Sequence, residues 1–249
     1  MRAILVLAML LVANAAAGAA EIKALITTAM HAAVVELVPP FERASGHKVT
    51  VSYDPSGGLA QRLRKDEFAD MILIASTELD KLVSEKKVMD RTDVSRTGVG
   101  LAVKKGAPHP DVSTPDALRK TLLAAKSIGQ SSIESGGITA LHVQRVLSVL
   151  GIKEEVSPRV KFAKGGPNGR VSVLVATGEA EIGLQQVSEL MSNPDVEVVG
   201  LLPDTLQQIT INSAGITANA KEADAARALI KHLTTPEALA IYKTKGLGL

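Results

Sequence analysis

Three turns that bring small hydroxyl residues to the start of a helix are the best candidates for chemistry in this sequence. They are Thr27-Thr28, Ser56-Gly57-Gly58 and Ser135-Gly136-Gly137, and each is expected to join a strand to a helix. The N-terminus of a helix leaves about four N–H groups unpaired and carries roughly half a positive charge. Gly lets a ligand approach that backbone, and a Ser or Thr hydroxyl adds a donor. Several such ends at one point would bind an anion without a Lys or Arg.

Each turn taken alone is more typical of an ordinary helix cap. The three together, however, lie at the carboxyl ends of expected strands, where open α/β sheets place their ligands. The pattern therefore indicates an anion site about as well as it indicates three caps.

Two histidines are expected close to these turns. His31 follows the first turn, and His142 lies one to two turns into the helix opened by the third. Either imidazole could reach a ligand held there, and either could equally be a partly buried structural residue. Glu134 and Glu181 are carboxylates near the same expected site, but no pair of acids has a spacing that demands general acid/base chemistry.

Motifs for other chemistry are missing from the sequence. It contains no G-x-x-x-x-G-K-[ST] loop, no G-x-G-x-x-G after a strand and no G-x-S-x-G elbow. It has no Cys, and its five His residues show no metal-ligand spacing. We therefore expect neither a nucleotide, a cofactor nor a metal ion.

The composition excludes further classes. The 249 residues include 28 basic and 26 acidic side chains, a formal net charge of +2, and the Lys/Arg runs are no longer than pairs. A nucleic-acid-binding protein usually carries a basic stripe, so no nucleic-acid partner is expected. Aromatic residues make up only 2% of the chain, too few for a base-stacking platform. The core must be aliphatic.

The first twenty residues have the order of a secretory signal peptide. Arg2 precedes an apolar stretch over residues 3–12, and small residues follow up to Ala20. The apolar stretch is about half the length of a membrane helix. The alternative is a hydrophobic N-terminal helix of the fold. We expect residues 1–20 to be cleaved after Ala19 or Ala20, leaving an exported, periplasmic protein.

Short apolar runs alternate with helical patterns along the rest of the chain. Strands are expected at 22–26, 49–53, 71–74, 100–103, 127–129 and 182–185, and helices at 30–44, 59–65, 79–85, 139–150 and 171–176. The helix at 30–44 should be disturbed by Pro39-Pro40. This alternation predicts an α/β fold with mostly parallel sheets.

Six segments, taken in order and spacing, resemble the type II periplasmic solute-binding proteins, in particular the molybdate-binding-protein-like branch. The segments are 24–30 (ALITTAM), 41–49 (FERASGHKV), 56–63 (SGGLAQRL), 68–75 (FADMILIA), 178–183 (GEAEIG) and the C-terminal 226–242. The resemblance covers nearly all of the chain after residue 20.

The resemblance implies a two-lobed fold in which each lobe is a mostly parallel sheet flanked by helices, and the ligand binds between the lobes. Crossovers are expected near 99–103 and 210–216. Lobe one would comprise 21–99 plus 211–249, and lobe two 100–210. Hinge closure on the ligand would follow from that layout.

The resemblance also implies a ligand site and a partner. The expected ligand-binding residues are Thr28, Ala29, Met30, Ser56 and Gly57 from lobe one, and Ser135, Gly136, Gly137, Gln185, Gln186 and Arg170 from lobe two. The protein would act as a monomer that captures a small anion and passes it to the membrane permease of an ABC-type importer.

Two positions depart from the molybdate-binding pattern. Ala29 stands where these proteins usually have Ser, and Gln186 stands where they usually have Tyr, whereas Ser56 is retained. Losing two hydroxyl donors favours a ligand with planar carboxylates over a tetrahedral oxyanion. The same broad group includes a periplasmic aconitate isomerase, which moves a proton along an allylic system. That alternative needs a base, and His31 or His142 could serve.

Overall fold

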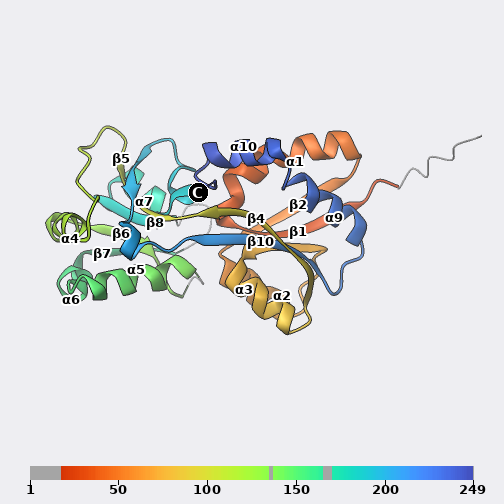
Figure 1. The fold of residues 1–249 in the computed structure, drawn as a ribbon, viewed down its shortest axis with the longest axis horizontal. Helices are drawn as coiled ribbons and strands as arrows, with labels where there is room; N and C mark the ends of the chain where they lie inside the picture. Colours follow the sequence, from red (N-terminus) through yellow and green to blue (C-terminus); the bar gives the residue numbers. More distant parts are fainter. Residues whose placement is uncertain (1–17, 135–136, 165–169, 249) are drawn as a thin grey trace, which may run out of the picture.

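The protein is built on two five-stranded sheets, as a computed structural model shows for residues 18–134, 137–164 and 170–248. The first sheet has the order β2-β1-β3-β10-β4 and the second β7-β6-β8-β5-β9. Each sheet forms its own lobe, on the right and left of Figure 1. The strands are β1 (Glu21–Thr27), β2 (Lys48–Asp54), β3 (Met71–Ala75), β4 (Val88–Thr97), β5 (Val99–Lys104), β6 (Ile128–Ser131), β7 (Val160–Ala163), β8 (Ile182–Gln186), β9 (Val196–Leu201) and β10 (Thr210–Thr217).

Helices flank both sheets, which confirms the α/β class. In the first lobe they are η1 (Thr28–Met30), α1 (His31–Ser45), α2 (Ser56–Arg64), α3 (Ser76–Ser84), α9 (Ala223–His232) and α10 (Pro236–Thr244). In the second they are α4 (Pro115–Ala124), α5 (Ile138–Val149), α6 (Lys153–Val156), η2 (Ser157–Arg159), α7 (Val171–Thr177), α8 (Val187–Leu190) and η3 (Asp204–Leu206). Among the described residues, none of these helices has the length and apolar character needed to cross a membrane.

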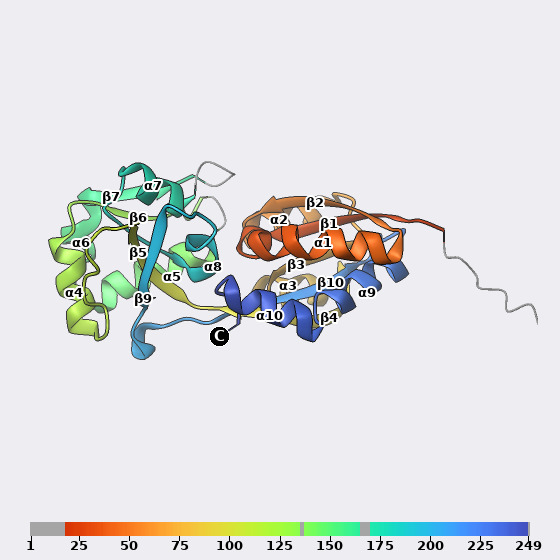
Figure 2. The same cartoon turned by 90° about the horizontal axis from the view of Figure 1, so that it is seen from above.

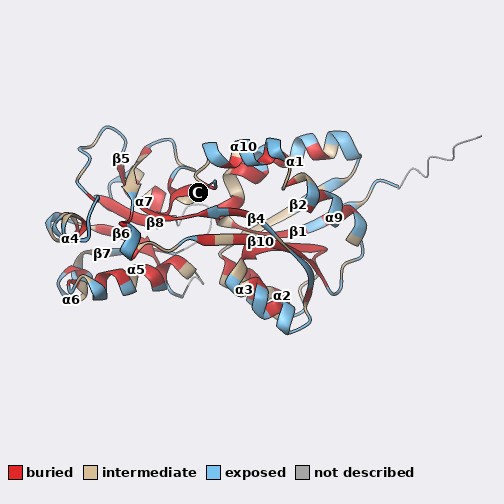
Figure 3. Cartoon of the chain, viewed as in Figure 1, coloured by how far each residue is buried: buried red, intermediate tan, exposed pale blue. Residues whose placement is uncertain are grey.

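Strand β3 shows how the sheet of the first lobe is covered on both faces. Met71 and Leu73 pack into the cluster formed with α1, α9 and α10, and Ile72 and Ile74 pack into the cluster formed with α2 and α3. All four side chains are fully buried. Figure 3 shows that the middle of this sheet is largely buried and that the outer faces of the helices are exposed. The continuous apolar run therefore gives the doubly covered strand that the sequence predicted.

In the second lobe, helix α7 packs unusually close to strand β8. A Cβ atom added to Gly183 would lie 2.7 Å from both Val171 Cγ1 and Val175 Cγ2 of that helix. Only a residue without a side chain allows this approach. Gly183 therefore allows α7 to lie this close to the sheet.

The sheets are mixed, whereas the sequence predicted mostly parallel ones. Of the eight strand pairings described, four are parallel (β1 with β2 and β3, β6 with β7 and β8). The other four are antiparallel and involve β10 or β5. These two strands are the ones that the chain enters on arriving from the other lobe, so they run against their neighbours.

The chain passes between the lobes at two adjacent places, at Gly98 and along residues 207–209 (Figure 2). The amide of Gln207 holds the two passages together. Its Oε1 accepts a hydrogen bond from Val99 N at 2.9 Å, and its Nε2 donates to Val99 O at 2.9 Å. The segments predicted as crossovers, 99–103 and 210–216, are strands of the two sheets, because the polypeptide crosses just before each. The lobe boundaries at residues 99 and 210 stay a prediction.

The sequence predicted that Pro39-Pro40 would disturb the helix at 30–44. In the structure helix α1 continues through both prolines and ends at Ser45. The two prolines cannot donate to the carbonyls of Val35 and Glu36, four residues earlier. Both of these residues are exposed, which leaves their carbonyls on the solvent side of the helix.

Asp70 is a fully buried carboxylate that connects three segments of the first lobe. Its Oδ2 accepts a hydrogen bond from Lys23 N at 2.8 Å, and its Oδ1 accepts from Lys221 N at 2.8 Å and Glu222 N at 2.9 Å. These bonds attach β1 and the start of α9 to the beginning of β3. A buried acceptor with three donors of this kind is far costlier to lose than a surface ion pair.

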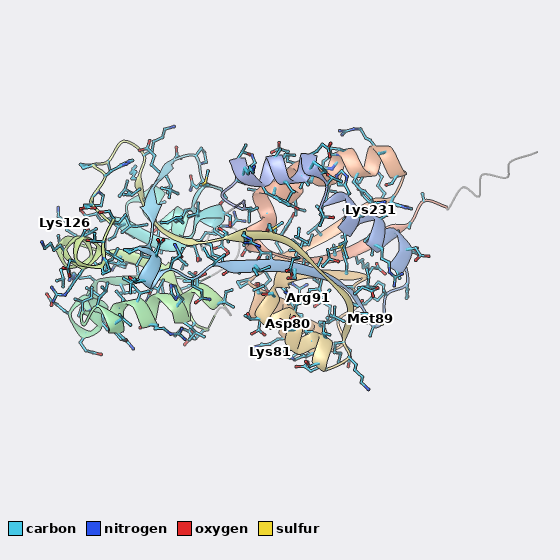
Figure 4. The ribbon with its side chains drawn as sticks, viewed as in Figure 1. Asp80, Lys81, Met89, Arg91, Lys126 and Lys231 are labelled. Carbon is cyan, nitrogen blue, oxygen red and sulfur yellow. The ribbon has the colours of Figure 1, made fainter. Side chains whose placement is uncertain are left out.

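Replacing Asp70 by Ala should lower the free energy of unfolding by about 2–4 kcal/mol, because three buried N–H groups lose their acceptor. Urea unfolding monitored by circular dichroism measures the loss. The matched control is Asp80→Ala, which removes an exposed carboxylate 3.2 Å from Arg91 Nε (both labelled in Figure 4) and should cost less than about 1 kcal/mol. Equal losses in the two variants would contradict a structural role for Asp70.

Candidate functional site

A cleft lies between the two lobes, at the carboxyl ends of strands from both sheets. Its empty space, together with the open solvent at its mouth, amounts to about 510 Å³. The ends of β1, β6, β7 and β8 and the first turns of α2 and α5 form its walls. The described residues that line it are Thr27, Thr28, Pro55, Ser56, Ser131, Gly137, Ile138, Thr139, Ala163, Arg170, Gln185, Gln186 and Glu189.

On the side of the first lobe, Ser56 connects three strand ends. Its Oγ donates to Thr27 Oγ1 at 3.1 Å and accepts from Ala75 N at 3.1 Å. Ser56 is also the first residue of α2, whose N-cap position, Pro55, makes no side-chain hydrogen bond to the helix. The leading N–H groups of α2 are therefore left for another partner at the wall of the cleft.

On the side of the second lobe, two amides close the end of β8. Gln185 Nε2 donates to Ser131 Oγ, and Gln185 Oε1 accepts from Gln186 N at 2.9 Å. Gln186 Nε2 donates to Thr210 Oγ1 at 3.2 Å, while its Oε1 is buried without a partner among the described residues. Helix α5 begins beside them, and Gly137 at its N-cap provides no side-chain acceptor.

Arg170 supplies positive charge at this wall. It occupies the N-cap of α7, its Nη1 lies 3.5 Å from Ser192 Oγ, and its Nε is buried without a partner among the described residues. A guanidinium with an unused buried donor can give a charge-assisted hydrogen bond to a ligand oxygen.

Glu189 is a lining residue that the sequence reading missed. It lies in α8, and its Oε1 accepts a hydrogen bond from Thr28 Oγ1, on the opposite lobe, at 3.0 Å. Burial raises the pKa of Glu189 above its ordinary value, although the Thr28 hydrogen bond and the charge of Arg170 act the other way. Its position three residues past the end of β8 was a usable signal, because ligands gather at such ends.

The structure thus brings six of the predicted ligand-binding residues into one cleft: Thr28, Ser56, Gly137, Arg170, Gln185 and Gln186. Ala29, Met30 and Gly57 do not line it. Turn η1 directs Ala29 and Met30 into the core of the first lobe, where Ser95 Oγ lies 3.0 Å from Met30 Sδ. Ser135 and Gly136 lie outside the described residues. Whether the six bind a ligand stays a prediction.

Neither predicted histidine lines the cleft. His31 packs edge-on against the Tyr53 ring, with centroids 4.7 Å apart, and burial, followed by the charge of Arg170, lowers the pKa of the imidazole. His142 Nε2 lies 2.9 Å from the Leu206 carbonyl, so Nε2 carries the hydrogen and Nδ1 is a buried acceptor without a described partner. Burial lowers the pKa of His142 despite that hydrogen bond.

The two carboxylates expected near the site are exposed elsewhere. Glu181 precedes β8 and accepts a hydrogen bond from Lys126 N, at the outer end of the second lobe (Lys126 in Figure 4). That is the end of the strand opposite to the cleft. Glu134 is exposed in the loop after β6. No group of three or more His, Asp or Glu residues within the described part of the chain is arranged to hold a metal ion.

The sequence model of the bacterial extracellular solute-binding protein family matches residues 22–248. The chain belongs to this family. Among characterised relatives of this solute-binding protein, an aconitate isomerase of a Pseudomonas species is 34% identical over 220 residues, covering 85% of this chain and 81% of that protein. The molybdate-binding protein ModA of Azotobacter vinelandii is 26% identical over 239 residues, covering 94% and 92% of the two chains.

Solved structures share the fold of this solute-binding protein. The periplasmic molybdate-binding protein of Azotobacter vinelandii aligns with a TM-score of 0.77 at 20% identity, over 92% of this chain and 99% of that one. The sulfate-binding protein SubI of Mycobacterium tuberculosis aligns with a TM-score of 0.72 at 16% identity, over 92% and 86%. The predicted resemblance and the two-lobed architecture are confirmed.

The lowered pKa of His142 has a consequence for stability. Below the ordinary value of 6.5, the unfolded chain protonates this ring while the folded protein still keeps it neutral. The free energy of unfolding should therefore fall more steeply in wild type than in His142→Gln as the pH drops from about 7.5 to 5.5, by up to about 1.4 kcal/mol per pH unit. Urea unfolding across this range measures both slopes, and parallel slopes would contradict the prediction. The contribution of His31 is the same in both proteins and cancels when the two slopes are compared.

Proposed function

We propose that this solute-binding protein captures a small anion in the cleft between its lobes and delivers it to the membrane permease of an ABC-type importer. The observation that carries the proposal is the convergence of the uncapped N-termini of α2 and α5 with Arg170 on one cleft. Oriented N–H groups and one guanidinium suit an anion that sheds its water on entry.

The relatives support an anionic ligand. Molybdate, sulfate and aconitate, the ligands or substrates in their names, are all anions with several oxygen atoms. In this chain the amides of Gln185 and Gln186 close the second wall. Amide groups of this kind suit planar carboxylates as well as tetrahedral oxyanions, so we include both classes in the proposal.

Export and state of assembly belong to the same proposal. We infer that residues 1–20 are a cleaved signal peptide and that the mature protein works in the periplasm as a monomer. The family match begins at residue 22, and β1 begins at Glu21, directly after the proposed cleavage site. An importer of this type needs its binding protein on the outer side of the permease.

A thermal-shift screen of the mature protein tests the ligand class. The panel holds molybdate, tungstate, sulfate, phosphate, citrate, cis-aconitate and trans-aconitate. An anion present at about a hundred times its dissociation constant should stabilise the fold by about 2.7 kcal/mol. Ser56→Ala should weaken binding of that anion by about 1–3 kcal/mol, since the Thr27 hydroxyl and the start of α2 lose the hydrogen bonds that position them at the cleft.

The control for Ser56→Ala is Ser84→Ala, which removes an exposed hydroxyl that donates to Asp80 O on the same lobe, outside the cleft. It should bind like wild type. If Ser56→Ala also binds like wild type, the assignment of the cleft is wrong. The same comparison with Ser135→Ala tests the third turn predicted from the sequence.

A second candidate function is isomerisation of aconitate in the same cleft. It is favoured by the relative with 34% identity, and by Glu189, a titratable side chain that lines the cleft. In an allylic shift a base removes a proton from the methylene carbon, the double bond moves by one carbon, and a proton is returned at the far end of the allylic system. The proton count of the substrate is unchanged.

Incubation with cis-aconitate, followed by proton NMR, separates the two functions. A binding protein leaves the compound unchanged, and we expect this outcome. An isomerase converts it to trans-aconitate and loses turnover in the variant that lacks its base. The variants to compare are Glu189→Gln, His31→Gln and His142→Gln, because the sequence pointed to the histidines whereas the cleft holds the glutamate.

A further inference from the structure

Glu189 places a carboxyl group in a cleft that is otherwise suited to negative charge. The side chain lines the same cavity as Arg170 and the N-terminus of α5. An ionised carboxylate there would repel an entering anion. We propose that Glu189 takes up one proton from solvent when the anion binds, and that its carboxyl group then donates a hydrogen bond to a ligand oxygen. This inference rests on the proposed function.

The hydrogen bonds around Glu189 leave one oxygen for the ligand. Thr28 Oγ1 donates to Oε1 at 3.0 Å, across the gap between the lobes. No hydrogen bond to Oε2 is found within the described part of the chain. A proton on Oε2 therefore turns that oxygen into a donor while Oε1 still accepts from Thr28. The neutral carboxyl group would thus serve both the lobe contact and the ligand.

The charge of Arg170 acts to lower the pKa of Glu189, but no ion pair within 4.0 Å joins these two side chains among the described residues. Helix α8 packs against η1, α7, β5, β8 and β9. On these elements Lys104 is exposed, Glu197 pairs with His109, and His31, which follows η1, packs on Tyr53. Glu189 therefore lacks a close counter-ion that would keep it ionised once an anion lies beside it.

An anion that enters the cleft should raise the pKa of Glu189, as burial does. Burial already raises the pKa of this carboxyl group. A like charge a few ångströms away disfavours the ionised form further, and closure of the lobes removes the water that would screen it. The proton converts a repulsive contact into a hydrogen bond. The affinity for the anion should therefore rise as pH falls, by up to about tenfold per pH unit, while the free protein has Glu189 ionised.

Isothermal titration calorimetry of the mature chain tests the proposal, with molybdate and cis-aconitate as the probes. Titrations at several pH values, each in two buffers of different ionisation enthalpy, count the protons taken up with each anion. Wild type should take up about one proton wherever the free protein has Glu189 ionised. Glu189→Gln, whose amide already offers an N–H donor beside an acceptor for Thr28, should bind with no uptake and with an affinity independent of pH.

Two controls locate the proton. Glu181→Gln removes an exposed carboxylate at the outer end of the same lobe and should keep the uptake. His31→Gln removes an imidazole whose pKa the charge of Arg170 lowers, and this variant should keep the uptake as well. Loss of uptake in His31→Gln, or uptake that persists in Glu189→Gln, would place the proton elsewhere and overturn the proposal.

The test separates this inference from the function on which it rests. If an anion binds to wild type without proton uptake at every pH of the series, the proposed function stands and the role of Glu189 is wrong. If wild type binds neither probe, the proposed anion capture fails for both ligand classes, and the proton uptake fails with it.

Discussion

The pair of hydrogen bonds between Gln207 and the backbone of Val99 constrains the arrangement of the lobes at the point where the chain crosses between them. It fixes the outgoing and returning passages of the chain side by side. With both passages fixed, the carboxyl ends of the strands in one sheet are directed toward those of the other (Figure 2). Every polar group in the cleft comes from those ends or from the helices that start there. The location of the cleft is therefore determined by the chain topology rather than by any one side chain.

The cleft combines many weak donors with few charges. Backbone N–H groups of α2 and α5, two glutamine amides and small hydroxyls surround one guanidinium and one carboxyl group. Such donors are oriented by the fold, so binding an anion costs little rearrangement of the walls. Two side-chain hydrogen bonds, Thr28 to Glu189 and Gln186 to Thr210, connect the lobes at the cleft. A ligand that enters must compete with these bonds or incorporate them.

Local sequence patterns predicted the elements whose structure is decided locally. The apolar run of β3 and the helix start at Ser56 were predicted because neighbours in the sequence determine both. Strand β10 was missed as a strand because its partners are distant: Asn212 pairs with Ala75 and Ser95. Ala29 and Met30 were placed in the cleft because the sequence does not show that η1 turns them inward. Glu189 was missed because its hydrogen-bond partner, Thr28, lies on the opposite lobe and far away in the sequence.

The contact between Gly183 and helix α7 has a consequence at some distance from it. Because Gly183 carries no side chain, α7 lies directly on β8, and the N-cap of that helix is Arg170. The height of the helix over the sheet thus sets how far the guanidinium reaches into the cleft. The absence of a Cβ atom at Gly183 thus affects the electrostatic potential in the cleft through the position of Arg170. A side chain at position 183 would therefore displace α7, and Arg170 with it, without replacing any residue that lines the cleft.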